Sequence, residues 1–127
     1  MTMGREHGPR VLVAEDERGV REFVARALGH AGLSVTVASD GQHALEALLA
    51  EPFDLLITDI VMPVLDGIEL ALMAAKYRPG MPILLITGYP AERSRALNLD
   101  ALIHGVLAKP FSLSELVGQA EAALALS

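Results

Sequence analysis

Short aliphatic runs alternate along this chain with longer segments in which apolar residues recur every three or four positions. The short runs are typical of β-strands, and they cover residues 10–14, 33–38, 54–59, 83–87 and 105–108. The longer spacing is typical of helices with one buried stripe, and it covers residues 20–31, 40–49, 68–75, 91–97 and 113–126. Strands and helices in strict alternation predict a right-handed, doubly wound, parallel α/β sheet of five strands, with five helices on its two faces in three layers.

Residues that break or cap helices mark the ends of these elements. Pro52 ends the second helix, and Ser112 with Glu115 has the spacing of a capping box that opens the last one. The run 33–38 alternates apolar and polar residues, which predicts a strand near a sheet edge. The segment 88–105 mixes helix formers with Asn and Asp, so we expect a short and irregular fourth helix there.

Composition narrows the class of protein. The chain has 127 residues, 52% of them hydrophobic and 4% aromatic, which predicts one domain with a core of Val, Leu, Ile and Ala. We expect a flexible tail over residues 1–9 and the domain over residues 10–127. The chain has no cysteine and no apolar run near the ~18 residues of a membrane span, which fits a cytoplasmic location. A net charge of −6 without a basic stripe makes nucleic acid a poor partner.

Polar side chains follow four of the five predicted strands. Glu15 and Asp16 follow the first strand, Asp59 ends the third, Thr87 ends the fourth, and Lys109 follows the fifth. Taken singly, each has an ordinary explanation as a helix cap, a turn residue or a solvated lysine. Because the carboxyl ends of parallel strands meet at one edge of a sheet, we expect these groups to converge on a single site.

The chemistry of this set points to phosphoryl transfer. Three neighbouring carboxylates repel each other, which raises the pKa of at least one. A divalent cation relieves the repulsion, and ligation by oxygen without His or Cys favours a hard ion such as Mg²⁺. Asp59 would attack phosphorus, the cation and Lys109 would stabilise the equatorial oxygens, and Thr87 would donate a hydrogen bond.

At this point the chain resembles a known family, the CheY-like receiver domains of response regulators. The resemblance covers residues 10–126 and rests on motifs at residues 13–17, 57–63, 66–67, 86–89 and 109–111. It implies a flavodoxin-like sheet with the strand order 2-1-3-4-5. It also implies that Asp59 is the phospho-acceptor, Lys109 the phosphate-binding ammonium and Thr87 the switch hydroxyl. The peptide bond between Lys109 and Pro110 would be cis.

The resemblance further implies a metal site. Asp16, Asp59 and the backbone carbonyl of Val61 would bind Mg²⁺, or Mn²⁺ in its place, with Glu15 acting through water. Such a protein is a phosphorylation switch rather than an enzyme, since it catalyses only its own phosphorylation and dephosphorylation.

The partners implied by the family are proteins. A histidine kinase or a histidine phosphotransfer protein would donate the phosphoryl group and dock beside Val20 and Phe23. The 127 residues leave no room for a DNA-binding output domain, so output would pass to a downstream protein through the surface around the fourth helix, fifth strand and fifth helix. Among stand-alone receivers the chain most resembles regulators of the CpdR type, which control substrate delivery to the ClpXP protease. A protease complex is therefore the implied downstream partner.

Three positions depart from the usual family pattern. Val106 stands where many relatives have an aromatic residue, so coupling of the switch hydroxyl to a ring at that position is not expected. Val61 replaces a frequent polar residue, and together with Tyr89 it would shield an acyl phosphate from water. We therefore predict slow spontaneous dephosphorylation. Val64 stands where glycine is frequent, which predicts a stiffer loop.

Other functions remain open from the sequence. The chain would be a constitutive, non-phosphorylated interaction module if the acidic set were inert, or a detached receiver domain of a hybrid histidine kinase. A metal-dependent phosphatase would need an acid–base group near Asp59, and position 61, two residues on, is valine. Neither a P-loop nor a GxGxxG motif is present, which argues against nucleotide binding.

Overall fold

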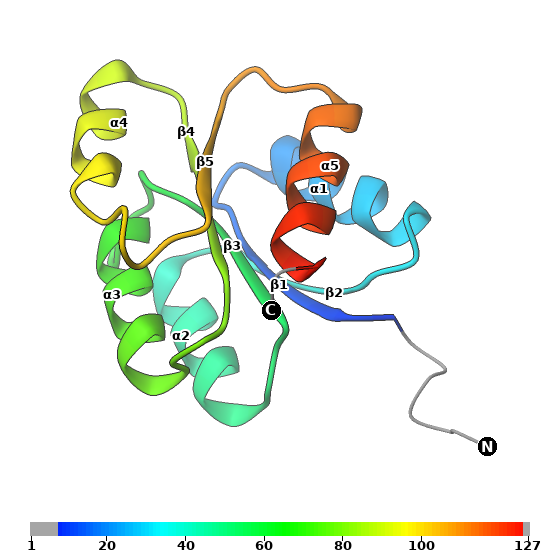
Figure 1. Cartoon of the computed structure of the whole chain (residues 1–127), viewed down its shortest axis with the longest axis horizontal. Helices are drawn as coiled ribbons and strands as arrows, with labels where there is room; N and C mark the ends of the chain where they lie inside the picture. The colour runs from blue at the N-terminus through cyan, green and yellow to red at the C-terminus, as the bar shows by residue number, and fades with distance from the viewer. Residues whose placement is uncertain (1–7, 126–127) are drawn as a thin grey trace.

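The protein is built on a single five-stranded parallel sheet, in the order β2-β1-β3-β4-β5 (Figure 1). The computed structural model describes residues 8–125, except for the side chains of Pro90, Arg93 and Leu97. The elements are β1 (Arg10–Ala14), α1 (Arg18–His30), β2 (Ser34–Ala38), α2 (Gly41–Ala50), β3 (Leu55–Asp59), α3 (Gly67–Tyr77), β4 (Ile83–Thr87), α4 (Pro90–Leu97), β5 (Gly105–Ala108) and α5 (Leu113–Ala125). The predicted fold class and strand order are confirmed. Most of the predicted tail, and the expected end of the last helix at Leu126, lie outside the described residues.

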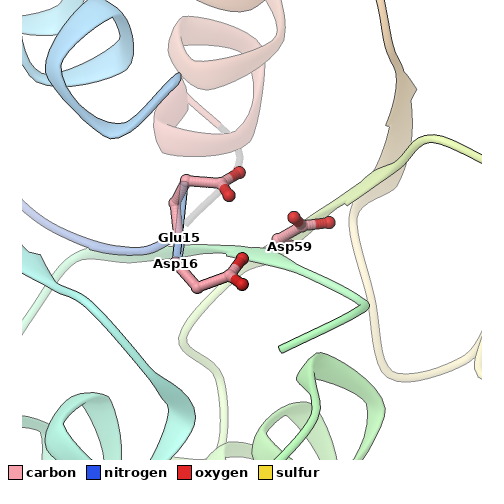
Figure 2. A group of neighbouring side chains, drawn as sticks. All are labelled: Glu15, Asp16 and Asp59. Atoms are coloured by element: carbon pink, nitrogen blue, oxygen red, sulfur yellow. The ribbon is translucent and has the colours of Figure 1, made fainter. Parts of the chain in front are cut away.

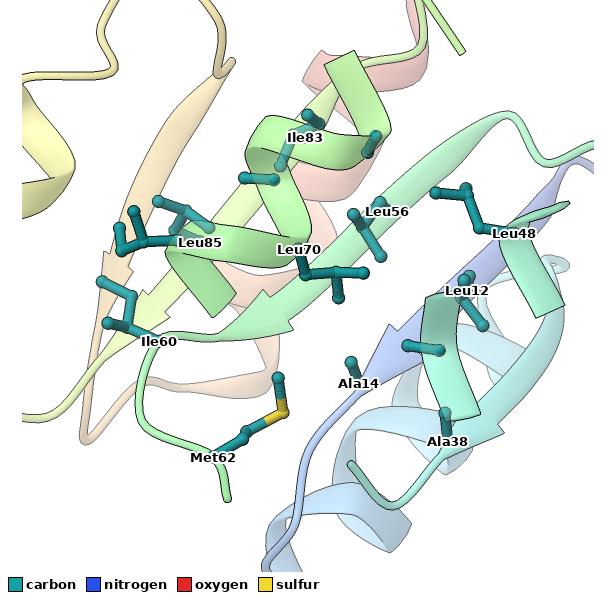
Figure 3. Close-up of a cluster of buried hydrophobic side chains, with 14 of the residues drawn as sticks. Leu12, Ala14, Ala38, Leu48, Leu56, Ile60, Met62, Leu70, Ile83 and Leu85 are labelled. Carbon is teal, nitrogen blue, oxygen red and sulfur yellow. The ribbon is translucent and has the colours of Figure 1, made fainter. Parts of the chain in front are cut away.

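Two apolar clusters hold the helices against the two faces of the sheet. Side chains alternate between the faces along a strand, so neighbouring residues of β1 enter different clusters. Leu12 lies in the cluster under α2, α3 and α4, together with Leu56 and Leu85 (Figure 3). Val13 lies in the cluster under α1 and α5. The core is aliphatic, as expected, and the three central strands β1, β3 and β4 are buried on both faces, which is typical of a parallel sheet covered by helices.

Local capping determines where several helices begin. Asp40 caps α2 by accepting a hydrogen bond from the backbone N–H of His43, at 2.7 Å. Ser112 and Glu115 form the predicted capping box before α5, with bonds of 2.8 and 3.0 Å. The fourth helix is short, as predicted, and Ala96 is its fully buried side chain among those described. None of the helices between residues 8 and 125 combines the length and the apolarity that a membrane crossing demands.

The register of the sheet places the strand ends side by side. The pairs nearest the carboxyl ends are Ala14 with Thr58, Asp59 with Ile86, and Thr87 with Ala108. The polar residues at or just after the ends of β1, β3, β4 and β5 therefore share one edge of the sheet.

Candidate functional site

Three carboxylates meet at the carboxyl edge of the sheet. Glu15 and Asp16 follow β1 and Asp59 ends the adjacent β3, and one oxygen from each lies within 4.8 Å of the others (Figure 2). Glu15 is fully buried and Asp59 is 5% exposed, whereas Asp16 is open to solvent. The convergence predicted from the sequence is thus observed for all three acids.

Lys109 supplies the positive charge of the site. Its ammonium nitrogen lies 3.0 Å from Oδ2 of Asp59 and 3.4 Å from Oε1 of Glu15. The backbone N–H of Lys109 donates to the carbonyl of Thr87 at 2.7 Å, and the peptide bond to Pro110 is cis, as the family resemblance implied. Partial burial lowers the pKa of Lys109, but the hydrogen bond and charge of Asp59, aided by Glu15, outweigh it and raise the pKa overall.

Glu15 is hydrogen-bonded at one oxygen, and at the other it has the ion pair with Lys109 but no hydrogen bond in the described structure. Its Oε2 accepts a hydrogen bond of 3.0 Å from the backbone N–H of Glu17, whereas buried Oε1 accepts none within the described part of the chain. The pKa of Glu15 is raised to about 7, chiefly by burial and also by the nearby charge of Asp59, while the hydrogen bond from Glu17 and the charge of Lys109 lower it. The site therefore holds a buried carboxylate oxygen that is ion-paired with Lys109 but accepts no hydrogen bond from the described residues.

This donor set fits a hard divalent cation. Carboxylate oxygens are the ligands that Mg²⁺ and Mn²⁺ take in proteins, and the three carboxylates include a buried oxygen with no hydrogen bond among the described residues. The part assigned to the backbone carbonyl of Val61 stays a prediction.

Hydrogen bonds from Thr58 in β3 and from the start of α3 hold the backbone at and just after Asp59. The hydroxyl of Thr58 donates to the carbonyl of Asp59 at 2.9 Å, and the N–H of Gly67 donates to the carbonyl of Ile60 at 2.8 Å. A Cβ at position 67 would lie 2.0 Å from the Asp59 carbonyl oxygen, so glycine is required there. In the loop between Asp59 and Gly67, Val64 has a φ of 73°, which lies in the left-handed region where β-branched residues are strained.

Thr87 lies at the end of β4 with its hydroxyl engaged inside the next loop. The hydroxyl donates to the carbonyl of Tyr89 at 3.0 Å and accepts from the N–H of Tyr89 at 3.3 Å. Among the described residues no hydrogen bond joins this hydroxyl to Asp59. A phosphoryl group on Asp59 would thus have to compete with Tyr89 for it, and Tyr89 immediately precedes α4.

A cavity of about 670 Å³ opens over Asp59. It is bounded by Glu17, Gly19, Val20, Phe23, Asp59, Val61, Gly88, Tyr89, Lys109, Pro110 and Phe111. The rings of Phe23 and Phe111 lie 6.2 Å apart, and Phe23 is 41% exposed, so this part of the α1 stripe is not core. Charged Asp59 and Lys109 thus lie in a cavity whose sides include the apolar residues Val20, Phe23 and Phe111.

The sequence did not indicate one contact. The guanidinium of Arg21, on α1, donates to the backbone carbonyls of Glu15 and Asp16, at 2.9 and 3.4 Å. An arginine on a helix is ordinarily read as a solvated residue. Its position six residues after Glu15, in the first turns of the helix that follows the acids, is the only sequence signal for this contact.

Comparisons with known proteins agree with this geometry. Residues 11–121 match the family described as response regulator receiver domain. The chain is 47% identical over 115 residues to the response regulator receiver protein CpdR of Brucella abortus (strain 2308), covering 88% of this chain and 93% of that protein. It is 38% identical over 115 residues to the response regulator MprA of Mycobacterium avium (strain 104), covering 91% of this chain. The chain spans 50% of the length of that MprA.

Solved structures share the fold. The response regulator TrrA of Thermotoga maritima, solved in complex with Mg²⁺-BeF, superposes with a TM-score of 0.84 at 32% identity, over 92% of this chain and 100% of that one. The chemotaxis response regulator CheY4 of Vibrio cholerae superposes with a TM-score of 0.84 at 29% identity, over 91% of this chain and 98% of that one.

Proposed function

Since this chain belongs to the response-regulator receiver domain family, we propose that it is a phosphorylation switch whose Asp59 accepts a phosphoryl group from a phosphohistidine. Receiver domains act as phospho-accepting switches, bind Mg²⁺ through an acidic pocket and interact with histidine kinases or phosphotransfer proteins. The observation that carries the proposal for this chain is the contact of 3.0 Å between Lys109 and Asp59 beside the acidic cluster.

The proposed reaction is a displacement at phosphorus. An oxygen of the Asp59 carboxylate bonds to phosphorus while the bond from phosphorus to the donor imidazole nitrogen breaks, and the electron pair leaves with that nitrogen. Lys109 donates to the transferred oxygens as it now donates to Asp59. Mg²⁺ or Mn²⁺, held by Asp16, Asp59 and the carbonyl of Val61 with Glu15 acting through water, would neutralise the charge that spreads over those oxygens.

The product would act on the rest of the molecule through Thr87. A phosphoryl oxygen is a stronger acceptor than a backbone carbonyl, because it is charged. The Thr87 hydroxyl would therefore leave the carbonyl of Tyr89, and the loop that leads into α4 would lose two hydrogen bonds. That exchange would bias the position of α4 and of the surface around it.

The proposed partners follow from the cavity and from the relatives. The apolar walls formed by Val20, Phe23 and Phe111 would receive the kinase or phosphotransfer protein, whose histidine must reach an almost buried Asp59. The output would go to a downstream protein, and the likeness to CpdR supports a protease complex as that partner. Slow loss of the phosphoryl group is proposed as well, because Val61 and Tyr89 line the cavity.

Mass spectrometry of the intact protein tests the proposal. Wild type, Asp59→Asn and the exposed-site control Asp100→Asn are incubated with Mg²⁺ and acetyl phosphate. A single phosphoryl adduct on wild type and Asp100→Asn, absent from Asp59→Asn, is expected. Release of phosphate without an adduct would instead indicate a phosphatase, and no reaction at all would indicate an inert interaction module.

A further inference from the structure

Arg21 contacts the backbone of both acidic residues that follow β1. It lies in the first turns of α1, where its N–H donates to the carbonyl of Glu17 at 2.9 Å. Helical side chains lean toward the N-terminus of their helix, so the guanidinium reaches back over the acidic loop. One of its nitrogens donates to the carbonyls of Glu15 and Asp16, at 2.9 and 3.4 Å.

We propose that Arg21 is a positioning residue for the divalent cation site. The guanidinium ties down the two peptide units from which the carboxylates of Glu15 and Asp16 project. The conformation in which both acids face Asp59 is thereby set before the cation arrives. The inference rests on the proposed function, because it assigns Arg21 a part in binding the same ion.

Two features of the site favour positioning over ordinary surface charge. A cation near a helix N-terminus is disfavoured by the helix dipole, so the place of Arg21 calls for a local compensation, which the two carbonyls supply. Among the described residues, the acidic loop has other hydrogen bonds or ion pairs at Glu15 alone: Oε2 accepts from the N–H of Glu17, Oε1 is ion-paired with Lys109 at 3.4 Å, and the Glu15 N–H donates to the carbonyl of Ala38 at 3.1 Å. Asp16 is exposed, and its carbonyl is held by Arg21.

Electrostatics and positioning predict opposite signs for the loss of Arg21. If only its charge mattered, removing a cation near the site would tighten the binding of a divalent ion. If Arg21 positions the acids, its removal would let the loop move and would weaken binding of the divalent ion. Loss of groups that orient metal ligands typically weakens metal binding by about tenfold or more. The sign of the change therefore decides between the two.

Arg18 offers a matched control. It lies one turn earlier on α1 and carries the same charge, but its side chain is exposed and pairs with Glu22 at 2.8 Å. Arg18→Met thus removes a charge from the same helix end without touching the acidic loop.

The test is a Mn²⁺ titration followed by electron paramagnetic resonance, which measures the free ion and needs no phosphorylation. Arg21→Met is expected to raise the Mn²⁺ dissociation constant about tenfold. Arg21→Lys, which keeps a donor, should recover part of the loss, and Arg18→Met should stay within about twofold of wild type. Arg21→Gln is measured beside it in case the methionine variant does not fold by circular dichroism.

A second measurement separates positioning from general damage. In labelling by acetyl phosphate, Arg21→Met should need more Mg²⁺ for half-maximal rate but reach a similar rate at saturating Mg²⁺. If wild type binds Mn²⁺ and Arg21→Met binds it at least as tightly as Arg18→Met does, the inference about Arg21 is overturned while the proposed metal site stands. A lower rate at saturating Mg²⁺ with unchanged half-saturation would do the same. Wild type that binds no Mn²⁺ would overturn both the inference and the proposed metal site.

Discussion

Replacing Glu15 by glutamine should stabilise the metal-free protein at alkaline pH. Glu15 is fully buried, and one of its oxygens accepts no hydrogen bond within the described residues. Burial, with the charge of Asp59, raises its pKa from 4.5 to about 7. The glutamine side chain has nearly the shape of the protonated acid and carries no charge, so it should resemble the form that the folded protein prefers.

The sign follows from proton linkage. Between pH 4.5 and about 7 the folded state keeps the Glu15 proton while the unfolded state has lost it, so stability falls as pH rises. A shift from 4.5 to about 7 corresponds to about 3 kcal/mol, lost in full above pH 7. Glu15→Gln should remove this decline and be more stable than wild type at pH 8 by up to about 3 kcal/mol.

Urea unfolding with EDTA, followed by circular dichroism at pH 5, 6.5 and 8, measures the effect. The difference in the free energy of unfolding between variant and wild type removes the contribution of groups that titrate alike in both proteins. Glu121→Gln, on the exposed face of α5, serves as control. Addition of Mg²⁺ at pH 8 should stabilise wild type more than Glu15→Gln, because the ion binds the folded state. A difference in stability that does not change with pH, or a Glu15→Gln protein weaker than wild type at pH 8, would refute the reasoning.

Three further changes act on the loop after Asp59. Val64→Gly should raise the free energy of unfolding by up to about 1 kcal/mol, because it relieves a positive φ that costs a non-glycine residue about 1–2 kcal/mol, less the greater chain entropy of glycine; a lower urea midpoint would contradict this. Asp66→Ala should destabilise by about 0.5–2 kcal/mol, because Asp66 accepts from the N–H of Glu69 in a capping box, and an unchanged midpoint would count against that. Val61→Asn should shorten the half-life of the phosphoryl adduct in the mass assay, since it adds a polar group beside Asp59, and an equal half-life would remove the proposed shielding.

The sequence alone determined the elements and the chemical inventory of the site. Hydrophobic periodicity is a local property, so the strands, the helices and the capping box at Ser112 could be read directly. Strict alternation predicted a parallel sheet, and a parallel sheet brings Asp16, Asp59 and Lys109 to one edge. The strand order came from family motifs, because alternation does not by itself choose among doubly wound topologies.

Only the tertiary structure decided the hydrogen bonds, burial and pKa of the site residues. The sequence did not predict four features: the Glu15 oxygen without a hydrogen bond among the described residues, the bond between Thr87 and Tyr89, the contact made by Arg21 and the positive φ of Val64. The burial of Glu15 arises when segments far apart in sequence pack together. The contacts of Thr87 and Arg21 and the φ of Val64 are local in sequence, but they depend on loop and side-chain conformations that a pattern of residue types does not specify. The same glutamate would keep its ordinary pKa in an open chain, and it is the surrounding protein that excludes water from it.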